Sequence, residues 1–469
     1  MRGFPVPRLP GLWALVISGA LGLPLACRAQ DAQDTAPAPP VTQTPESKLP
    51  ALLGAQYTFI VQHQTSLHSP YAGALSLDPT GDTQPTHTLG VYFGWAPLHW
   101  AQAYLDVEKF MGDGVSHATG LGGLTNGDVV REGASGLKKE FYIARSYLRL
   151  VLPLGSEVTA VARAQDQIPD SEASTHLEFK FGRLAVNDDF DRNRYAGSAR
   201  TQFMNWSLWQ NTAWDYAANT RGYTDGAVLG FVTAAWSLRY GVYRMPVLAN
   251  GQTLESSLSV ARGENVELTM SPWASGTVLR LLAYRNRAGM GDYLAALRLA
   301  AVAGTTPDIV ADDRPGRHKW GLGINAEQPL ADEGETGLFA RLGWNDGKTE
   351  SFAFTEVDQH LSVGGQLALG RWHRPQDRVA VAIVAEGLSA PHREYLAAGG
   401  SGFLLGDGRL NYAPEQIVEA YYRWQLDESL GRFPWRLQLS PDVQYVRNPG
   451  FNHDRGPVGF WSLRLHLEY

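Results

Sequence analysis

The last nine residues of the chain, WSLRLHLEY, alternate strictly between apolar and polar side chains. The odd-numbered positions are apolar, and the even-numbered positions are Ser462, Arg464, His466 and Glu468. Because successive side chains of a β-strand point to opposite faces, one face of this segment is apolar and the other is polar. Such a strand, closing on the aromatic Tyr469, suits a place between lipid and water and indicates an outer-membrane barrel.

The same alternation recurs from about residue 53 onward. Examples of apolar sets are Leu89, Val91, Phe93 and Trp95; Leu338, Ala340, Leu342 and Trp344; and Val418, Ala420, Tyr422 and Trp424. A soluble antiparallel sandwich also alternates in this way. Aromatic residues at the ends of the sets, and connections that alternate between short and long, favour the barrel. Short links are predicted at 96–97, 271–276, 330–335 and 372–378, and long ones at about 109–137, 187–225, 287–315 and 388–413.

The number of strands follows from the two termini. About seventeen segments qualify, whereas a bacterial barrel with both ends on the periplasmic side needs an even number. The weakest candidate is 157–164, and removing it leaves sixteen; counting 203–214 as a strand would give eighteen. We therefore predict an all-β, transmembrane antiparallel β-barrel of about 16 strands, with 18 as the alternative. Either size leaves an aqueous channel.

The N-terminal part of the chain has the pattern of an exported protein. Arg2 and Arg8 precede an apolar run over 12–26, and the small residues near Ala29 indicate a signal peptide over 1–29. Residues 30–51 are rich in Pro, Thr and Gln and are predicted to be a linker, which leaves 52–469 for the barrel. The apolar stretch 288–303 is interrupted by charges, which predicts an amphipathic loop helix.

Composition and motifs argue against several other functions. The net charge is −7 with both signs mixed, so no nucleic-acid partner is expected. Asp189, Asp191 and Asn193 copy the start of a calcium loop, but Arg194 stands where the loop needs Gly. Asp188 and Asp189 lack the substrate cleft of a glycosidase. We expect no metal, no cofactor and no enzymatic activity.

Three stretches carry a resemblance to a known family. They are FGRLAVNDDFDRNRYAGSARTQFMNWSLWQNTAWDYAANTRGYTDG at 181–226, GLFARLGWNDGKTE at 337–350, and LSPDVQYVRNPGFNHDRGPVGFWSLRLHLEY at 439–469. All three resemble the carbohydrate-selective porins of the OprB type, in the right order. The resemblance implies a sixteen-stranded channel that passes glucose-like mono- or oligosaccharides into the periplasm of a Gram-negative bacterium.

Candidate functional residues fall into two groups. The long connection 187–225 combines charges with aromatic residues, which suits hydrogen bonds to sugar hydroxyls and stacking on a pyranose ring. We predict that it folds inward as a constriction and binds solute through Asp189, Asp191, Arg192, Arg194, Arg200, Trp206, Trp209, Trp214, Asp215 and Arg221. Pairing of these charges with one another, to hold the loop on the wall, is an equal alternative. Lumen-lining residues are predicted at Arg341, Glu419, Arg423, Arg436, Asp442 and Arg464, and further inward positions at Asp106, Glu108, Arg145, Arg149 and Arg239.

The predicted function is passive, carbohydrate-selective diffusion through an outer-membrane porin. The expected partners are sugars as solutes, outer-membrane lipid, and the barrel assembly machinery, which would recognise the strand ending in Tyr469. An adhesin barrel, a general-diffusion channel and an outer-membrane hydrolase are the alternatives. Whether the barrel is a monomer or a trimer stays open.

Overall fold

The structure is a computed structural model that describes residues 51–128, 137–352, 355–426 and 435–469. These residues belong to one compact unit, Leu49–Tyr469. The predicted signal peptide at 1–29 and the predicted linker, apart from its last residue, lie outside the described residues.

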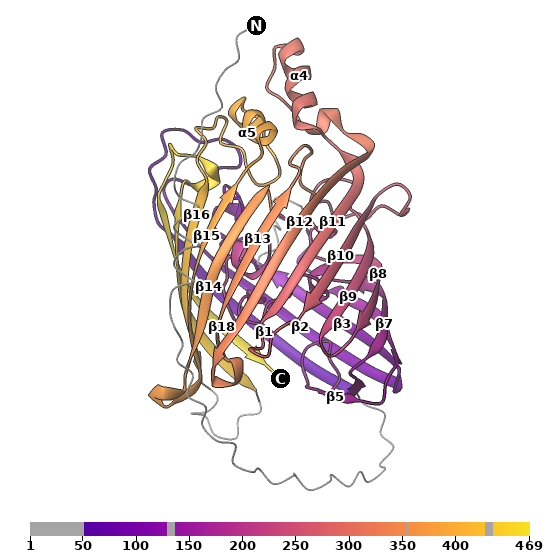
Figure 1. The fold of residues 1–469 in the computed structure, drawn as a ribbon. Coiled ribbons are helices and arrows are strands. Elements are labelled where there is room, and N and C mark those ends of the chain that lie inside the picture. The colour runs from indigo at the N-terminus through magenta and orange to yellow at the C-terminus, as the bar shows by residue number, and fades with distance from the viewer. Residues whose placement is uncertain (1–50, 129–136, 353–354, 427–434) are drawn as a thin grey trace. The chain divides into compact units, whose positions relative to one another are not determined.

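The described chain forms one closed antiparallel barrel (Figure 1). The barrel has sixteen strands, in the order β1-β18-β17-β16-β15-β14-β13-β12-β11-β10-β9-β8-β7-β4-β3-β2, and β5 and β6 form a separate two-stranded sheet. The first and last strands close the barrel, with Phe59 opposite Leu465 and Val61 opposite Leu463. The predicted antiparallel barrel of sixteen strands is therefore confirmed.

The barrel strands are β1 (Ala51–Gln64), β2 (Asp82–Leu98), β3 (Ala101–Met111), β4 (Tyr142–Pro153), β7 (His176–Leu184), β8 (Thr224–Val232), β9 (Trp236–Arg244), β10 (Arg262–Met270), β11 (Val278–Met290), β12 (Arg314–Ala331), β13 (Thr336–Asn345), β14 (Gln359–Leu369), β15 (Arg374–Gly387), β16 (Glu415–Gln425), β17 (Arg436–Arg447) and β18 (Val458–Glu468). The separate hairpin is β5 (Val158–Val161) and β6 (Asp170–Ala173).

Helices occur in the connections. They are α3 (Trp206–Trp209), α4 (Tyr293–Ala303) and α5 (Ala390–Ala397), with short 3-10 helices η1 (Val115–Ala118), η2 (Val186–Asp188), η3 (Val310–Asp312), η4 (Asp332–Gly334), η5 (Gly370–Trp372) and η7 (Pro449–Phe451). The predicted loop helix is α4, which begins at an Asp292 cap. Among the described residues, no helix is both long and apolar enough to cross a membrane.

The barrel is apolar outside and polar inside, the reverse of a soluble protein. In β18 the outward Trp461 is 59% exposed, while the inward Arg464 is 1% exposed. The outward Val381 and Ile383 of β15 are both 55% exposed. A soluble sandwich buries its apolar face between its sheets. The exposed apolar face therefore excludes the sandwich and fits a barrel in lipid.

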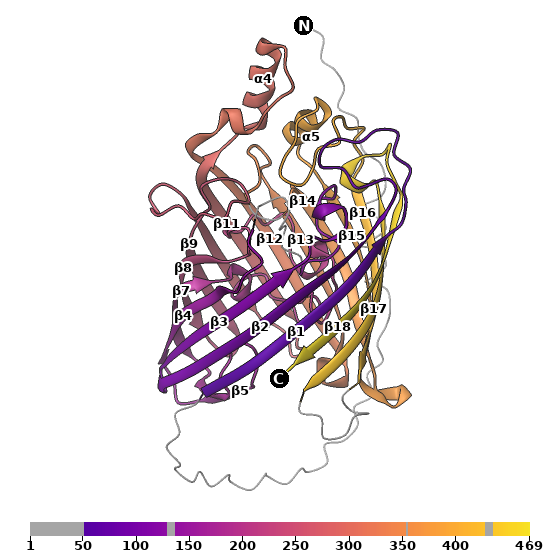
Figure 2. The ribbon, with the colours of Figure 1, turned by 180° about the vertical axis from the view of Figure 1, so that it is seen from behind.

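The two ends of the barrel differ in the length of their connections. One end carries short turns such as 99–100, 233–235 and 271–277, and the C-terminus lies at this end, while α4 and α5 stand at the other (Figures 1 and 2). The predicted turn at 96–97 is instead part of β2, where the pairing is irregular between Trp95 and Leu98. Proline is tolerated at such bulges. The short-turn end is the periplasmic end.

The alternative count of eighteen strands is wrong for two reasons. The segment 203–214 contains the helical turn α3 and pairs with no strand. The weak candidate 157–164 contributes only β5, which pairs with β6 outside the barrel. The connection from β4 to β7 therefore stays at the periplasmic end, and the loop 185–223 belongs to the outer end.

We expect the replacement Val381→Arg to lower the free energy of unfolding by about 2–4 kcal/mol, because it places a charge in the middle of the lipid-facing band. The matched control is Val158→Arg in β5, where the valine is 66% exposed but lies outside the barrel. This control should change the unfolding free energy by about 0.5 kcal/mol or less. Denaturant unfolding in lipid vesicles measures both, and equal costs would contradict the orientation of β15.

Candidate functional site

The loop 185–223 folds into the lumen and is fastened to the far wall. Arg341 of β13 is fully buried and donates hydrogen bonds to the backbone oxygens of Leu208 at 2.7 Å and Ala196 at 2.8 Å. Its Nε also lies 3.0 Å from the carboxylate of Asp191. One guanidinium thus joins three points of the loop, because its five donors point in fixed directions.

Two further wall residues hold the middle of the loop. The carboxylate of Glu419 accepts the backbone N–H groups of Met204 and Asn205, at 2.5 and 3.0 Å. The Arg464 guanidinium donates to the carbonyls of Ala199 and Gln202, each at 2.7 Å. These charges face inward, but they satisfy the backbone of the loop instead of facing open water.

The last part of the loop is also packed. Trp214 is 1% exposed, and its Nε1 donates to Asn265 at 2.9 Å. The Asp215 carboxylate accepts the backbone N–H of Phe352 at 2.9 Å. Residues so enclosed have little surface to offer a solute, and their placement favours an anchoring role.

The open space left by the loop lies along β3, β4 and β7. A cavity of about 290 Å³ lies on the outer side, and one of about 620 Å³ lies toward the periplasm. The two cavities adjoin at a set of shared lining residues, which we call the neck. The neck comprises Arg145, Gln165, Asn187, Asp188, Gly197 and Ser198.

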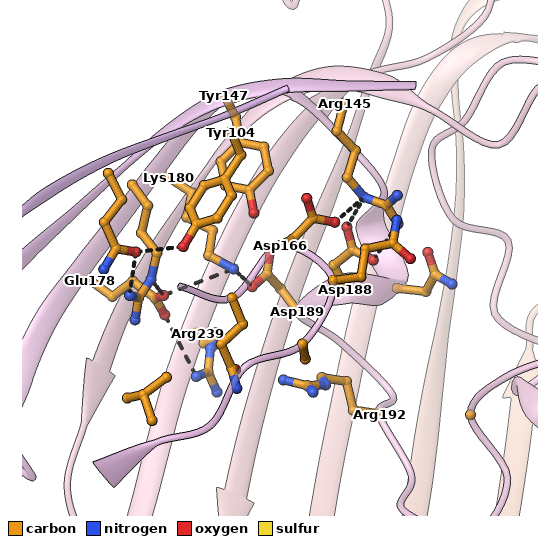
Figure 3. Close-up of a pocket in the computed structure, with 18 of the residues that line it drawn as sticks. Tyr104, Arg145, Tyr147, Asp166, Glu178, Lys180, Asp188, Asp189, Arg192 and Arg239 are labelled. Carbon is orange, nitrogen blue, oxygen red and sulfur yellow. Dashed lines mark hydrogen bonds and ion pairs between the residues drawn. The ribbon is translucent and has the colours of Figure 1, made fainter. Parts of the chain in front are cut away.

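One arginine dominates the electrostatics of the neck. Arg145 lies 2.7 Å from Asp188 and 3.3 Å from Asp166 (Figure 3). It also lies 3.1 Å from Asp106. Burial raises the pKa of Asp166 well above its ordinary value, and Arg145 opposes that rise only in part. Burial also acts to raise the pKa of Asp188, but the charge and hydrogen bonds of Arg145 outweigh it, so the net shift is downward. Three carboxyl groups around one guanidinium give the neck an excess of acidic groups.

The outer cavity joins loop charges to tyrosines. Arg200 donates to Asp128 at 2.8 Å and to Glu108 at 3.1 Å. Tyr223 donates to the same Glu108 at 2.6 Å. The Arg221 guanidinium lies 4.1 Å from the centre of the Tyr142 ring. These charges are paired, so the wall offers hydrogen-bonding edges and ring faces without a large net charge.

The inner cavity has the same character (Figure 3). Lys180 contacts Asp189 at 2.5 Å, and Arg149 contacts Glu178 at 2.6 Å. The rings of Tyr104 and Tyr147, on its wall, are stacked with centroids 5.0 Å apart. Arg192 differs from its neighbours because its guanidinium is exposed in this cavity and makes no hydrogen bond or ion pair within the described chain.

The structure divides the predicted site residues into three groups. Those lining the two cavities are Asp189, Asp191, Arg192, Arg200, Trp206, Trp209 and Arg221. Those buried in contacts that hold the loop are Trp214, Asp215, Arg341, Glu419 and Arg464, together with Asp191, which also lines a cavity. Asp442 is buried as well, and it accepts a hydrogen bond from Gln444 of its own strand. Arg194 reaches Glu335 at the periplasmic end, 3.0 Å away, and Arg423 and Arg436 line a further cavity of about 880 Å³ there.

Sequence reasoning did not find the small polar residues of the neck. Gln165, Asn187 and Ser198 lie in the connections between strands, where polar residues are the rule. One feature of the sequence pointed to this region: the segment 157–164 has too weak a pattern for a strand that spans the membrane. Among the described residues, no group of three or more His, Cys, Asp or Glu side chains is arranged to hold a metal ion.

A closed barrel with an apolar outside, a polar lumen and an inward-folded loop defines a channel protein of the porin class. The family model described as carbohydrate-selective porin, OprB family, matches residues 98–469. The chain belongs to this family, and it is a sugar-selective porin of the Gram-negative outer membrane. Family and fold both point to a channel rather than an enzyme.

Comparison with one solved structure supports the fold. A high-pH structure of OprB from Pseudomonas putida superposes with a TM-score of 0.65 at 16% identity, covering 90% of this chain and 94% of that one. The outer-membrane channel DcaP of Acinetobacter baumannii gives a TM-score of 0.46 at 11% identity, covering 89% of this chain and 97% of that one. No curated protein sequence matches the chain.

We expect Arg341→Ala to loosen the loop, because it leaves Asp191 and two loop carbonyls buried without their donor. Breaking a buried ion pair costs about 3–5 kcal/mol, so thermal unfolding in detergent should shift downward and single-channel current should become larger and noisier. Arg436→Ala is the control, because the Arg436 side chain is 58% exposed beside Glu468. If the single-channel current of Arg341→Ala kept the amplitude and the low noise of the unaltered protein, the anchoring role would be contradicted.

Proposed function

We propose that neutral sugars diffuse passively through the outer cavity, the neck and the inner cavity in turn. The observation that carries this proposal is that the two cavities adjoin at a polar neck. A channel must bind its solute weakly and at several places, so that entry and exit are both fast. Two adjoining cavities with hydrogen-bonding walls meet that need.

The wall chemistry supports a neutral polyol over an ion. A sugar hydroxyl both donates and accepts, so it can use a carboxylate edge and a guanidinium edge at once. The charge of Arg145 is paired with Asp188, and the charges elsewhere on the walls are largely paired as well, so the path offers little attraction for either anions or cations. Trp209, which is only partly buried, lines the outer cavity, and an indole ring suits the C–H face of a pyranose.

The size of the cavities supports glucose-like solutes. The outer cavity, about 290 Å³, is at the lower limit of the roughly 300–1,000 Å³ typical of small-molecule sites. A mono- or disaccharide fits this scale, while a long, extended oligosaccharide would have to pass stepwise. We therefore place the preference at short neutral saccharides.

A solute series in liposome swelling tests the proposal. Glucose should enter faster than maltose, maltose faster than a trisaccharide, and gluconate more slowly than glucose. Planar-bilayer current should fall when glucose is added and should not fall with a neutral amino acid of similar size. Equal entry rates for glucose and gluconate, without block of the current by sugar, would indicate a general-diffusion channel without sugar preference. The absence of any conductance would indicate an adhesin barrel.

The outer surface supports two further partners within this proposal. Outward residues such as Trp461 and Leu463 form an apolar face that fits outer-membrane lipid. The C-terminal strand β18 presents this face up to Tyr469 and is the segment that the assembly machinery would recognise. Truncation of the last strand should abolish insertion into the membrane, as measured by resistance to urea extraction.

We expect Arg192→Ala to weaken block of the current by glucose about fivefold, since a hydrogen bond is worth roughly 1 kcal/mol. The control is Arg194→Ala, two residues away, whose guanidinium is engaged with Glu335 outside both cavities. Current noise analysis with increasing glucose gives the binding constant of each variant. An effect of Arg194→Ala as large as that of Arg192→Ala would contradict the path.

A further inference from the structure

The periplasmic connection between β4 and β7 is long for its end of the barrel. It spans 154–175, whereas other turns at this end, such as 99–100 and 233–235, have two or three residues. Its two arms pair as β5 and β6, with Val161 opposite Asp170. Residues 162–169 form the tip of this hairpin.

The tip enters the lumen and is held there by several groups. Gln165 donates to Asp106 at 2.9 Å and accepts from Gln56 at 3.1 Å. Ile168 is 1% exposed, and its backbone N–H donates to the Tyr104 hydroxyl at 3.3 Å. The tip therefore contacts the inner face of β3, which is the neighbour of β4, and that of β1, which lies beyond β2.

Further contacts fasten both the base and the tip of the hairpin to the barrel. Glu172 of β6 pairs with Arg149, whose Nη2 donates to it at 2.8 Å. Arg163 donates to the carbonyls of Leu53 at 2.8 Å and Tyr469 at 3.0 Å, which lie at the closing seam of the barrel. A turn that served only to connect two strands would need none of these contacts.

The tip is part of the wall along the solute path. Gln165 is one of the residues of the neck, and Asp166 adds a carboxylate to Arg145. Val161, Ala164, Gln167 and Ile168 line the inner cavity beside it. The loop 185–223 narrows the lumen from the outside, and the hairpin meets it at the neck from the periplasmic side.

We infer that the tip of the β5–β6 hairpin is a second constriction, entering from the periplasm, and that Gln165 is a specificity-determining residue that sets the largest saccharide able to pass. This inference rests on the proposed function for the identity of the solute. The constriction itself concerns the width of the pore and applies to any solute, including salt.

The hairpin can be shortened by a replacement that keeps β5 and β6 paired. Val161 and Asp170 face each other, so an Asn-Gly pair in place of 162–169 closes the two strands with a tight turn. The control replaces 271–277, between β10 and β11, by the same pair; this turn lines none of the three cavities described. The heat-dependent shift of each barrel in electrophoresis checks folding.

Removal of the tip should raise conductance in potassium chloride and speed the entry of a trisaccharide, which the unaltered protein passes more slowly than maltose. The control deletion should leave conductance and the size limit unchanged. Unchanged conductance and size limit in a folded tip deletion would overturn the inference. A similar rise of conductance in the tip deletion and in the control deletion would also overturn the inference, because the rise would then not be specific to the hairpin.

Point variants at Gln165 keep the test decisive if the deletion fails to fold. Gln165→Ala should speed the entry of maltose relative to glucose, and Gln165→Trp should slow both and lower the conductance. A merely structural role would shift the two variants in the same direction. If salt conductance responds as expected but no variant distinguishes sugars, the constriction stands and the proposed sugar preference fails.

Discussion

The absence of hydrogen-bond partners in hydrocarbon is the constraint on which the whole structure depends. Every backbone N–H and C=O at membrane depth must be satisfied within the protein, which for strands requires a closed ring. The pairing of β1 with β18 closes that ring and leaves no free edge. Closure at sixteen strands makes the ring too wide for its own side chains to fill, so the lumen must be occupied by water, by loops or by both.

The loop 185–223 fills much of that space, and this changes the role of the inward charges. An inserted loop brings its own polar backbone, which needs partners as much as the wall does. Arg341, Glu419 and Arg464 supply them, so these charges hold the loop in place instead of meeting solute. The permeation path is left to the wall formed by β3, β4 and β7, where charges are paired with one another and surround a single neck.

The neck is built from both sides of the membrane. An outer loop and a periplasmic hairpin meet near Arg145, which lies within 3.3 Å of three carboxyl groups. Two successive connections, one before and one after β7, thus determine one aperture from opposite ends of the barrel. Paired charges offer a solute many weak hydrogen bonds, and they do not create a strong net charge that would bind an ion tightly. Both properties suit the passage of a neutral polyol.

The sequence by itself indicated the antiparallel barrel and its orientation, because apolar and polar residues alternate with a period of two and the connections alternate between short and long. It left the strand number at sixteen or eighteen, and only the exposure of the apolar face in the structure excluded a soluble sandwich. It also located the constriction loop and several of its cavity-lining residues, such as Arg192 and Arg200. Only the tertiary structure decided which inward charges are anchors and which face solute, since Arg341 and Arg436 look alike on their strands but differ in what the loop covers. The same holds for Gln165, whose role depends on where a hairpin folds, and no local pattern encodes a contact between segments more than fifty residues apart.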